Sequence, residues 1–240
     1  MSQEESRLKW SEIAKEQRYE NLDVSYNAVQ EQVYQIAHYY ANNSKINIEQ
    51  NKTYAISDTH GDMGALLESL LRSGTVEFVD SKEPCIVVVN DYNPDHKILI
   101  PNLKLKGGCT NKLMICGDII DRGQHTYSCM MLMKHLMNQQ TQQKSNNIIF
   151  TVGNHEDMTA DGVNRNAYLP LIDTSDIYRG TNKDYNMAKA VILDMVEQDQ
   201  MVFCYYDENT NTIYSHVPFD MENTQKALKF IQNNKSEFSE

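Results

Sequence analysis

Short apolar runs alternate with stretches of helical periodicity over most of this chain. The runs have the length of strands and lie at residues 52–57, 112–116 and 148–152. The helical stretches lie at residues 63–72, 125–139, 155–160 and 183–198. Because strands and helices alternate, the pattern predicts an α/β protein.

The ends of the chain and one internal segment depart from this alternation. Residues 1–50 are polar and contain no glycine, and apolar residues at helical spacing predict a helix at 25–42 within a helical extension. Residues 74–111 lack helical character, and strands at 85–89 and 97–100, joined by a polar turn at 90–95, predict a β-rich insertion. The remaining predictions are a Gln-rich linker at 139–147, a hairpin of strands at 201–206 and 212–215, and a last helix at 221–234.

Composition narrows the class of protein. The length of 240 residues fits one domain with an extension, and the formal net charge of −11 argues against a nucleic-acid-binding protein. The chain has no apolar run near the ~18–20 residues that span a bilayer, and its polar start is unlike a secretory signal. Five scattered cysteines without a Cys-x-x-Cys pair are typical of reduced thiols. We therefore expect a cytoplasmic protein without a membrane span.

Ligand-type side chains follow four of the predicted strands. They are Asp58, His60, Asp118, Asn154 and His216. In α/β folds, ligands gather beyond the carboxyl ends of strands. A strand-end carboxylate such as Asp118 is costly to bury unless it is paired or binds a metal. Carboxylate, imidazole and amide groups bind divalent cations, and two adjacent cations can clamp the oxygens of a phosphoryl transfer.

These segments resemble the signature of the calcineurin-like metallophosphoesterase superfamily. Residues 58–60 match its Asp-x-His, residues 117–123 match Gly-Asp-x-x-Asp-Arg-Gly, residues 153–156 match Gly-Asn-His-Glu, and His216 stands at the strand-end histidine. The middle two motifs are most similar to the phosphoprotein phosphatase branch. The resemblance implies a β-sandwich of mixed sheets flanked by helices. It makes residues 51–240 the catalytic domain, with the C-terminal part of the family domain missing.

The resemblance also implies a role for each residue. Two divalent ions (Mn, Fe or Zn, with Mn expected in vitro) would be held by Asp58, His60, Asp118, Asn154 and His216. His155 would protonate the leaving group, Asp121 would orient His155, and Arg122 would bind the substrate phosphate. Arg165 and Arg179 are candidates for a further phosphate contact.

The implied function is that of a metal-dependent phosphoprotein phosphatase. In such an enzyme, a hydroxide held between two metals attacks a phosphate monoester. The expected partner is a phosphorylated protein, with residues 1–50 or 74–111 as candidate binding segments. The composition and the insertion are also compatible with a bacterial effector that acts in a host cytosol. The choice between phosphoserine/threonine and phosphotyrosine stays open.

Other functions remain to be weighed. A hydrolase of dinucleoside polyphosphates or other small phosphoesters stays open. So does a catalytically weakened binding or scaffold member, because the chain ends before the family's last metal-binding His and last phosphate-binding Arg. Cys116 and Arg122 have the Cys-x5-Arg spacing of cysteine phosphatases, but Asp118 and Asp121 would repel phosphate inside that loop. Ser57 also stands where protein phosphatases usually have glycine.

Overall fold

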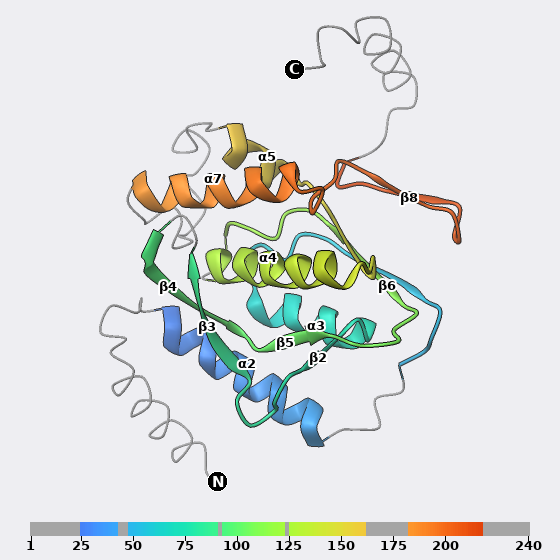
Figure 1. Cartoon of the computed structure of the whole chain (residues 1–240), viewed down its shortest axis with the longest axis horizontal. Coiled ribbons are helices and arrows are strands. Elements are labelled where there is room, and N and C mark those ends of the chain that lie inside the picture. The colour runs from blue at the N-terminus through green and yellow to red at the C-terminus, as the bar shows by residue number, and fades with distance from the viewer. Residues whose placement is uncertain (1–24, 43–47, 91–92, 123–124, 162–181, 218–240) are drawn as a thin grey trace, which may run out of the picture.

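The computed structural model describes residues 25–42, 48–90, 93–122, 125–161 and 182–217 (Figure 1). A three-stranded parallel sheet in the order β1-β6-β7 lies at the centre of the fold. Its strands are β1 (Thr53–Ile56), β6 (Lys112–Cys116) and β7 (Ile148–Thr151). Ile56 pairs with Ile115 and Cys116 pairs with Thr151, so all three strands end at the same edge of the sheet.

Two helices cover one face of this sheet. α3 (Met63–Ser73) begins after Asp62, whose carboxylate accepts a hydrogen bond of 3.0 Å from Ala65 N, and ends at Gly74 in the left-handed conformation. α4 (Thr126–Gln143) follows the loop after β6. Buried side chains of both helices and of the sheet form one core, which includes Leu66, Leu70, Met130, Met133, Leu113, Ile115 and Phe150.

The opposite face of the sheet carries a hairpin, β8 (Tyr205–Asp207) paired with β9 (Thr212–Tyr214). Lys112 alternates with the core residue Leu113 and therefore points away from the helices. Lys112 Nζ lies 3.0 Å from one carboxylate oxygen of the buried Asp207, and the other oxygen accepts a hydrogen bond of 3.2 Å from Thr53 Oγ1. These contacts tie the hairpin to the amino ends of β1 and β6.

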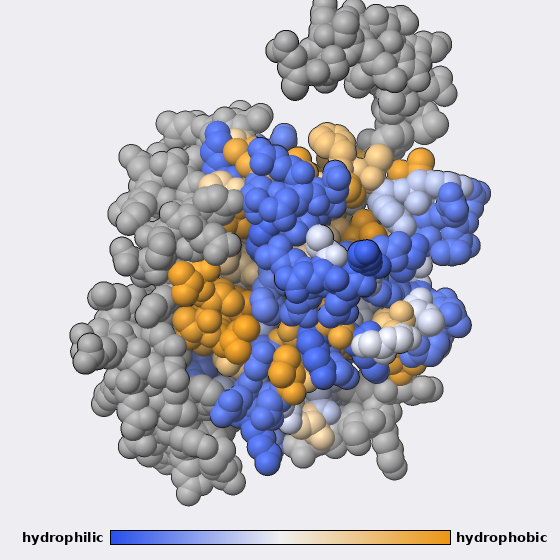
Figure 2. All heavy atoms as spheres, viewed as in Figure 1, coloured by the Kyte–Doolittle hydropathy of each residue, from blue (hydrophilic) through white to orange (hydrophobic). Residues whose placement is uncertain are grey.

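The segment 74–111 forms two antiparallel pairs. β2 (Val76–Phe78) pairs with β5 (Leu103–Leu105), and β3 (Cys85–Asn90) pairs with β4 (Asn93–Pro101). The pairs contact α4 and α2 (Ser25–Asn42) and bury Ile98, Leu99 and Ile100. Figure 2 shows hydrophobic side chains gathered over β3 and β4. The segment thus contributes to the core, while partner binding through it stays a prediction.

The β3–β4 hairpin differs from the predicted one. β4 begins at Asn93, inside the polar turn predicted at 90–95, and Asn90 pairs with Asn93 after a register shift. Hydrogen bonds between the backbones hold this pairing, so polar residues extend the strands beyond the apolar pattern. The strand predicted at 97–100 is therefore only part of a longer one.

The helix α4 is also longer than predicted. It continues to Gln143, through part of the segment expected to be a linker at 139–147. Gln140 stabilises this end, because its side-chain amide accepts a hydrogen bond of 2.9 Å from Ile148 N and donates one of 2.7 Å to Ile148 O. Glutamine is a good helix former, and here its polar group also satisfies the start of β7.

The remaining elements mostly follow the predicted pattern. α2, α5 (Asn154–Asp161) and α7 (Asn182–Glu197) stand where helices are predicted. The prediction of a strand at residues 201–204 is wrong. This segment pairs with β7 at one position only, the bridge between Val202 and Thr151, which is too little to form a strand. The helix expected at 221–234 lies outside the described residues. In the part of the chain that the structure describes, no helix has the length and apolarity needed to cross a membrane.

The fold class is confirmed at the level of a mixed α/β protein. The described strands form one parallel sheet and three antiparallel pairs, accompanied by helices. The β-sandwich, the extension at 1–50 and the domain boundary at residue 51 stay predictions. The parallel sheet is the part that matters for chemistry, because its carboxyl edge carries the polar loops described next.

Candidate metal centre and active site

The loops that follow β1 and β6 are joined backbone to backbone. Asp58 N donates a hydrogen bond of 3.2 Å to Gly117 O. His60 N donates one of 2.9 Å to Asp118 O. Site residues other than glycine adopt left-handed φ angles between 44° and 75° here, namely Asp58, His60, Asp118, Asp121 and Arg122. Such angles are uncommon for these side chains, so the surrounding contacts must hold a strained backbone in place.

Two glycines allow the loops after β6 and β7 to approach each other closely. A Cβ atom on Gly117 would lie 2.4 Å from Gly153 Cα. A Cβ atom on Gly153 would lie 2.2 Å from Asp118 Oδ1 and 2.3 Å from Asp118 N. Gly117 also has a φ of 70°, which glycine adopts without strain. Neither position has room for a side chain.

We expect Gly153→Ala to destabilise the protein by about 1–3 kcal/mol, the usual range for overpacking a close contact. The added methyl group would push against the Asp118 carboxylate, so activity should also fall at least ~10-fold. Denaturant unfolding and hydrolysis rates measure the two effects. Gly107→Ala is the matched control, because a Cβ atom there meets nothing within 4 Å. Equal stability and activity in the two variants would contradict the close-contact role of Gly153.

Glu156 holds the same two loops with a buried carboxylate that is 1% exposed. Its Oε2 accepts hydrogen bonds of 2.8 Å from Asp118 N and 2.9 Å from Gly153 N. Its Oε1 accepts hydrogen bonds of 3.0 Å from Ile119 N and 3.3 Å from Ile120 N. Burial raises the pKa of the Glu156 carboxyl, while the amide donor of Asp118 acts in the opposite direction. Glu156 thus positions the loop that carries Asp118.

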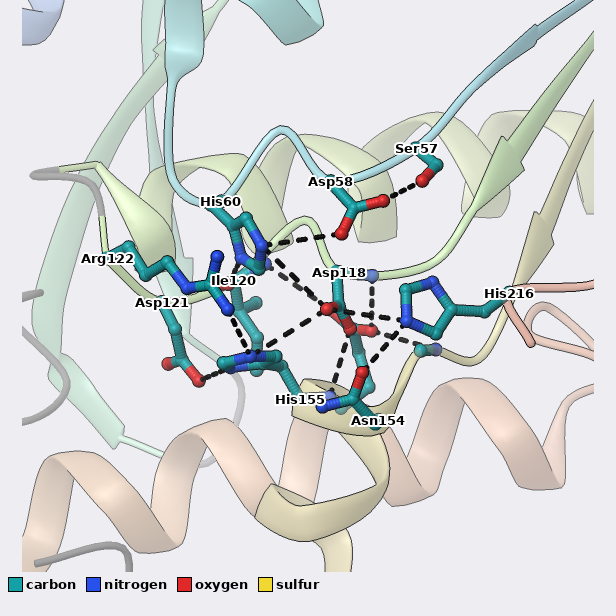
Figure 3. A network of polar contacts seen from close by, with 12 residues as sticks. Ser57, Asp58, His60, Asp118, Ile120, Asp121, Arg122, Asn154, His155 and His216 are labelled. Carbon is teal, nitrogen blue, oxygen red and sulfur yellow. Dashed lines mark hydrogen bonds and ion pairs between the residues drawn. The ribbon is translucent and has the colours of Figure 1, made fainter. Parts of the chain in front are cut away.

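Three imidazole rings converge on one carboxylate oxygen (Figure 3). The Nε2 atoms of His216, His155 and His60 lie 3.4, 3.7 and 3.8 Å from Asp118 Oδ2. The second oxygen, Asp118 Oδ1, accepts a hydrogen bond of 3.0 Å from His155 N, which fixes the carboxylate plane. Asp118 is buried, so its polar partners are these neighbours rather than water.

His60 and His216 are arranged as metal ligands usually are. His60 Nδ1 lies 3.1 Å from Ile120 O, and His216 Nδ1 lies 2.8 Å from Cys116 O, so each ring donates to a carbonyl. The Nε2 atoms then face oxygens, and buried His60 Nε2 has no hydrogen-bond partner. Ligating histidines commonly donate their other N–H in this way. The donors therefore fit divalent cations.

The candidate ligand atoms form two groups that share Asp118. Within each group they lie within 4.8 Å of one another, one group being His60, Asp118 and His155, and the other Asp58, Asp118 and His216. Asp58 also connects the groups, because its Oδ1 lies 3.5 Å from His60 Nε2. Ser57 Oγ donates a hydrogen bond to Asp58 Oδ2. Asn154 Oδ1 adds a further oxygen, 2.9 Å from His216 Nε2.

His155 has polar partners that differ from those of His60 and His216. Its Nδ1 lies 2.5 Å from Asp121 Oδ2, and Asp121 is fully buried. Its Nε2 lies 3.4 Å from Arg122 Nη2. A guanidinium group only donates, so Nε2 accepts a hydrogen bond in this contact. The ring proton is therefore on Nδ1, which donates a hydrogen bond to Asp121. The ring is therefore held with Nε2 between Arg122 and Asp118, a placement suited to a proton-transfer group.

The structure brings together all the predicted site residues that it describes. They are Asp58, His60, Asp118, Asp121, Arg122, Asn154, His155 and His216 (Figure 3). They come from the loops after β1, β6 and β7 and from the end of the β8–β9 hairpin. Arg165 and Arg179 lie outside the described residues. The individual roles stay predictions.

Some contacts in the site had no signal in the sequence. The carbonyl groups of Cys116 and Ile120 orient two imidazoles, and every residue has such a carbonyl. In the sequence, Ser57 stands out only because protein phosphatases usually have glycine there. Its hydrogen bond to Asp58 depends on the loop conformation, which the sequence does not show. Glu156 belongs to the motif Gly-Asn-His-Glu, but the motif gives no indication of its four amide donors.

Comparison with known proteins identifies the family. A family model described as calcineurin-like phosphoesterase matches residues 52–238. A cold-active protein-tyrosine phosphatase of a psychrophilic Shewanella species is similar at 20% identity with a TM-score of 0.33, over 61% of this chain and 40% of that one. A second cold-active protein tyrosine phosphatase structure has 20% identity and a TM-score of 0.31, over 62% and 35%.

The chain thus spans less than half of the length of these two phosphatases. No curated protein matches it significantly. The family model covers most of the sequence, including all four ligand-bearing segments. The chain therefore belongs to the calcineurin-like phosphoesterase family, whose members are metal-dependent phosphoester hydrolases.

Proposed function

We propose that this chain is a phosphoprotein phosphatase that uses two divalent cations. The observation that carries this proposal is the convergence of three imidazole nitrogens on Asp118 Oδ2, at 3.4–3.8 Å, with Arg122 beside one of them. A shared carboxylate between two ligand groups suits a pair of cations. The adjacent guanidinium suits a phosphate anion.

The proposed ligands form two sets that share Asp118 and differ from the two groups above, because His155 is left out, Asp58 joins His60, and Asn154 joins His216. Asp58, His60 and Asp118 would hold one cation, and Asp118, Asn154 and His216 would hold the other. When bound, the cations supply Lewis acids for the phosphoryl oxygens and lower the pKa of bound water. Asp118 Oδ1 is anchored by His155 N, so the carboxylate that would hold both cations is fixed in orientation. The backbone clamp of Glu156 keeps this geometry before substrate arrives.

The other side chains act on the substrate. Arg122 is exposed, so its planar guanidinium group can bind two phosphoryl oxygens of a substrate that arrives from solvent. His155 holds a proton at Nδ1 toward Asp121, which fixes the ring, while Nε2 serves the leaving-group oxygen. When Arg122 binds phosphate, it no longer donates to His155 Nε2, so that nitrogen can take up a proton from solvent and give it to the leaving-group oxygen. These residues require no covalent phosphoenzyme.

The charge around the site supports a protein-borne phosphate over a polyphosphate. Arg122 is the one Lys or Arg side chain among the described residues that contacts the cluster in Figure 3. A polyphosphate chain would need several cations to neutralise it. Asp58, whose side chain is 53% exposed, opens the other side of the cluster to solvent. A single phosphate on a large partner can therefore reach the site.

A substrate panel tests this proposal. With added Mn²⁺, we expect hydrolysis of phosphopeptides and a small aryl phosphate, and little release of phosphate from a dinucleoside polyphosphate. Cys116→Ser should retain full activity, because burial raises the pKa of the Cys116 thiol and disfavours a nucleophilic thiolate. Preferred hydrolysis of the polyphosphate would support the small-molecule alternative. Tight cation binding without hydrolysis of any substrate would support the scaffold alternative.

A further inference from the structure

The β8–β9 hairpin and its flanks expose four bulky apolar side chains. We call them the outer shelf: Phe203 (76% exposed), Tyr206 (52%), Ile213 (43%) and Val217 (52%). Tyr206 and Ile213 are direct cross-strand partners, so they lie on the same face of the hairpin. Figure 1 shows the hairpin at the periphery of the molecule. Phe203 and Val217 flank this pair in the sequence, two residues before β8 and three residues after β9. Neighbouring exposed apolar groups commonly mark an interaction site.

The outer shelf is held rigidly although it is exposed. On the inner face of the hairpin, the buried Asp207 binds Lys112 Nζ at 3.0 Å and Thr53 Oγ1 at 3.2 Å. Lys112 Nζ also donates a hydrogen bond of 3.1 Å to Tyr205 OH. These contacts fix the hairpin against β1 and β6. A partner that binds the opposite, outer face would therefore meet a preorganised surface.

The outer shelf is continuous with the candidate active site on two sides. Val217 directly follows His216, whose Nε2 lies 3.4 Å from Asp118 Oδ2. Phe203 directly follows Val202, which pairs with the end of β7 through Val202 N to Phe150 O at 3.0 Å and Val152 N to Val202 O at 2.9 Å. β7 leads within two further residues into Asn154. Both ends of the shelf are thus next in the chain to residues that reach the cluster or pair with the strand leading into it.

The charge of this region indicates what such a chain carries. Residues 190–217 contain five acidic residues and no Lys or Arg. Asp194 and Asp207 are paired with Lys134 and Lys112, whereas Glu197, Asp199 and Glu208 are exposed. The segment that carries the shelf is therefore negatively charged, and the exposed Glu208 directly follows β8. Electrostatic complementarity favours a cationic partner there.

We propose that the outer shelf binds the peptide segment next to the phosphorylated residue of a protein substrate, and selects segments that combine a bulky apolar side chain with arginine or lysine. The proposal rests on the proposed phosphatase function and names its substrate class. The apolar side chain packs on Phe203 and Ile213, while the cation faces the exposed acidic residues. The acidic surface at the same time disfavours peptides rich in Asp and Glu.

The test uses three phosphopeptides of equal length: a parent with leucine and arginine next to the phosphorylated residue, one with serine in place of leucine, and one with glutamate in place of arginine. Fluorescence anisotropy with labelled peptides and metal-free protein gives the Kd without requiring hydrolysis. Hydrolysis rates with Mn²⁺, including a small aryl phosphate, give kcat and KM. The variant is Phe203→Ala/Ile213→Thr. The matched control is Leu193→Ala/Val196→Thr, at residues of α7 that are 41% and 43% exposed and lie outside the shelf.

We expect the shelf variant to bind the parent peptide about tenfold more weakly, and to show this loss in KM with little change in kcat. The serine peptide should bind the unchanged protein and the shelf variant equally, with the weaker affinity that the shelf variant shows for the parent peptide. The aryl phosphate should be hydrolysed equally by the two proteins. Glu208→Lys should reduce the preference for arginine over glutamate. The control should resemble the unchanged protein throughout.

The outcomes separate this proposal from the proposed function. Parent binding that is the same in the shelf variant, or an equal loss on the aryl phosphate, would overturn the shelf proposal while leaving phosphatase activity standing. Shelf-dependent binding of a peptide that is never hydrolysed would instead overturn the phosphatase function and support the shelf as a binding surface. A stronger affinity for the glutamate peptide would also overturn the shelf proposal.

Discussion

Asp118→Asn should lower phosphoester hydrolysis by at least ~10³-fold, because residues that act as one unit lose most of the unit's effect when one is removed. Asp118 Oδ2 is the oxygen on which His60, His155 and His216 converge. Asparagine keeps the shape but removes the negative charge that would bridge two cations. Steady-state rates on an aryl phosphate measure the loss. Mn²⁺ binding, followed by electron paramagnetic resonance, should weaken in parallel.

The control for this variant is Asp80→Asn, at an exposed aspartate outside the cluster. Both variants should unfold cooperatively at similar denaturant concentrations, which separates lost chemistry from lost structure. An Asp118→Asn protein that retains a rate within tenfold of the unchanged protein, with normal Mn²⁺ affinity, would show that Asp118 does not bridge cations.

His155→Ala is the second large effect, with an expected fall in kcat of ~10²–10⁴-fold, the usual contribution of a general acid or base. The geometry allows His155 either to bind a cation or to transfer a proton, and the two roles predict different effects on Mn²⁺ affinity. His155 Nε2 stands in a ligand group with His60 and Asp118, yet its Nδ1 is bound to Asp121 and its Nε2 contacts Arg122. We predict that Mn²⁺ affinity is nearly unchanged, since the proposed ligands do not include His155.

The leaving group provides an internal check on His155. An aryl phosphate with a very acidic phenol needs little protonation as it departs, so His155→Ala should slow it much less than a phosphoserine peptide. His135→Ala is the matched control, at a histidine of α4 whose Nε2 lies 2.8 Å from Gln139 Nε2, outside the cluster. Loss of Mn²⁺ binding in His155→Ala would assign this residue to the metal instead.

The parallel sheet and the site loops could be predicted from local sequence. β6 was predicted with its observed bounds, since its apolar run begins after Lys112 and stops just before Gly117. All the site residues except His216, which follows β9 of the hairpin, follow strands of the parallel sheet, whose carboxyl ends meet at one edge. Residues far apart in the chain, such as Asp58 and Asn154, are joined there by topology alone. This explains why the order of the ligand-bearing segments along the chain could predict that their side chains meet in one site.

Other parts of the structure depend on contacts that no local pattern records. α4 runs past the apolar pattern because Gln140 satisfies the backbone of Ile148, which lies in another element. β4 extends through polar residues because pairing uses the backbone. The left-handed φ of Asp118, 55°, is imposed by the amide clamp of Glu156 and by the approach of Gly153. Propensity favours none of these choices, and tertiary contacts decide them.

The central claim is that hydrolysis requires cations held by the cluster around Asp118. The most direct measurement strips the protein with a chelator, removes the chelator, and titrates Mn²⁺ while following both bound metal and hydrolysis of a phosphopeptide. We predict no measurable rate in the stripped protein and a rate that rises with bound Mn²⁺, toward two ions per chain. A full rate in protein that contains no metal would contradict the account.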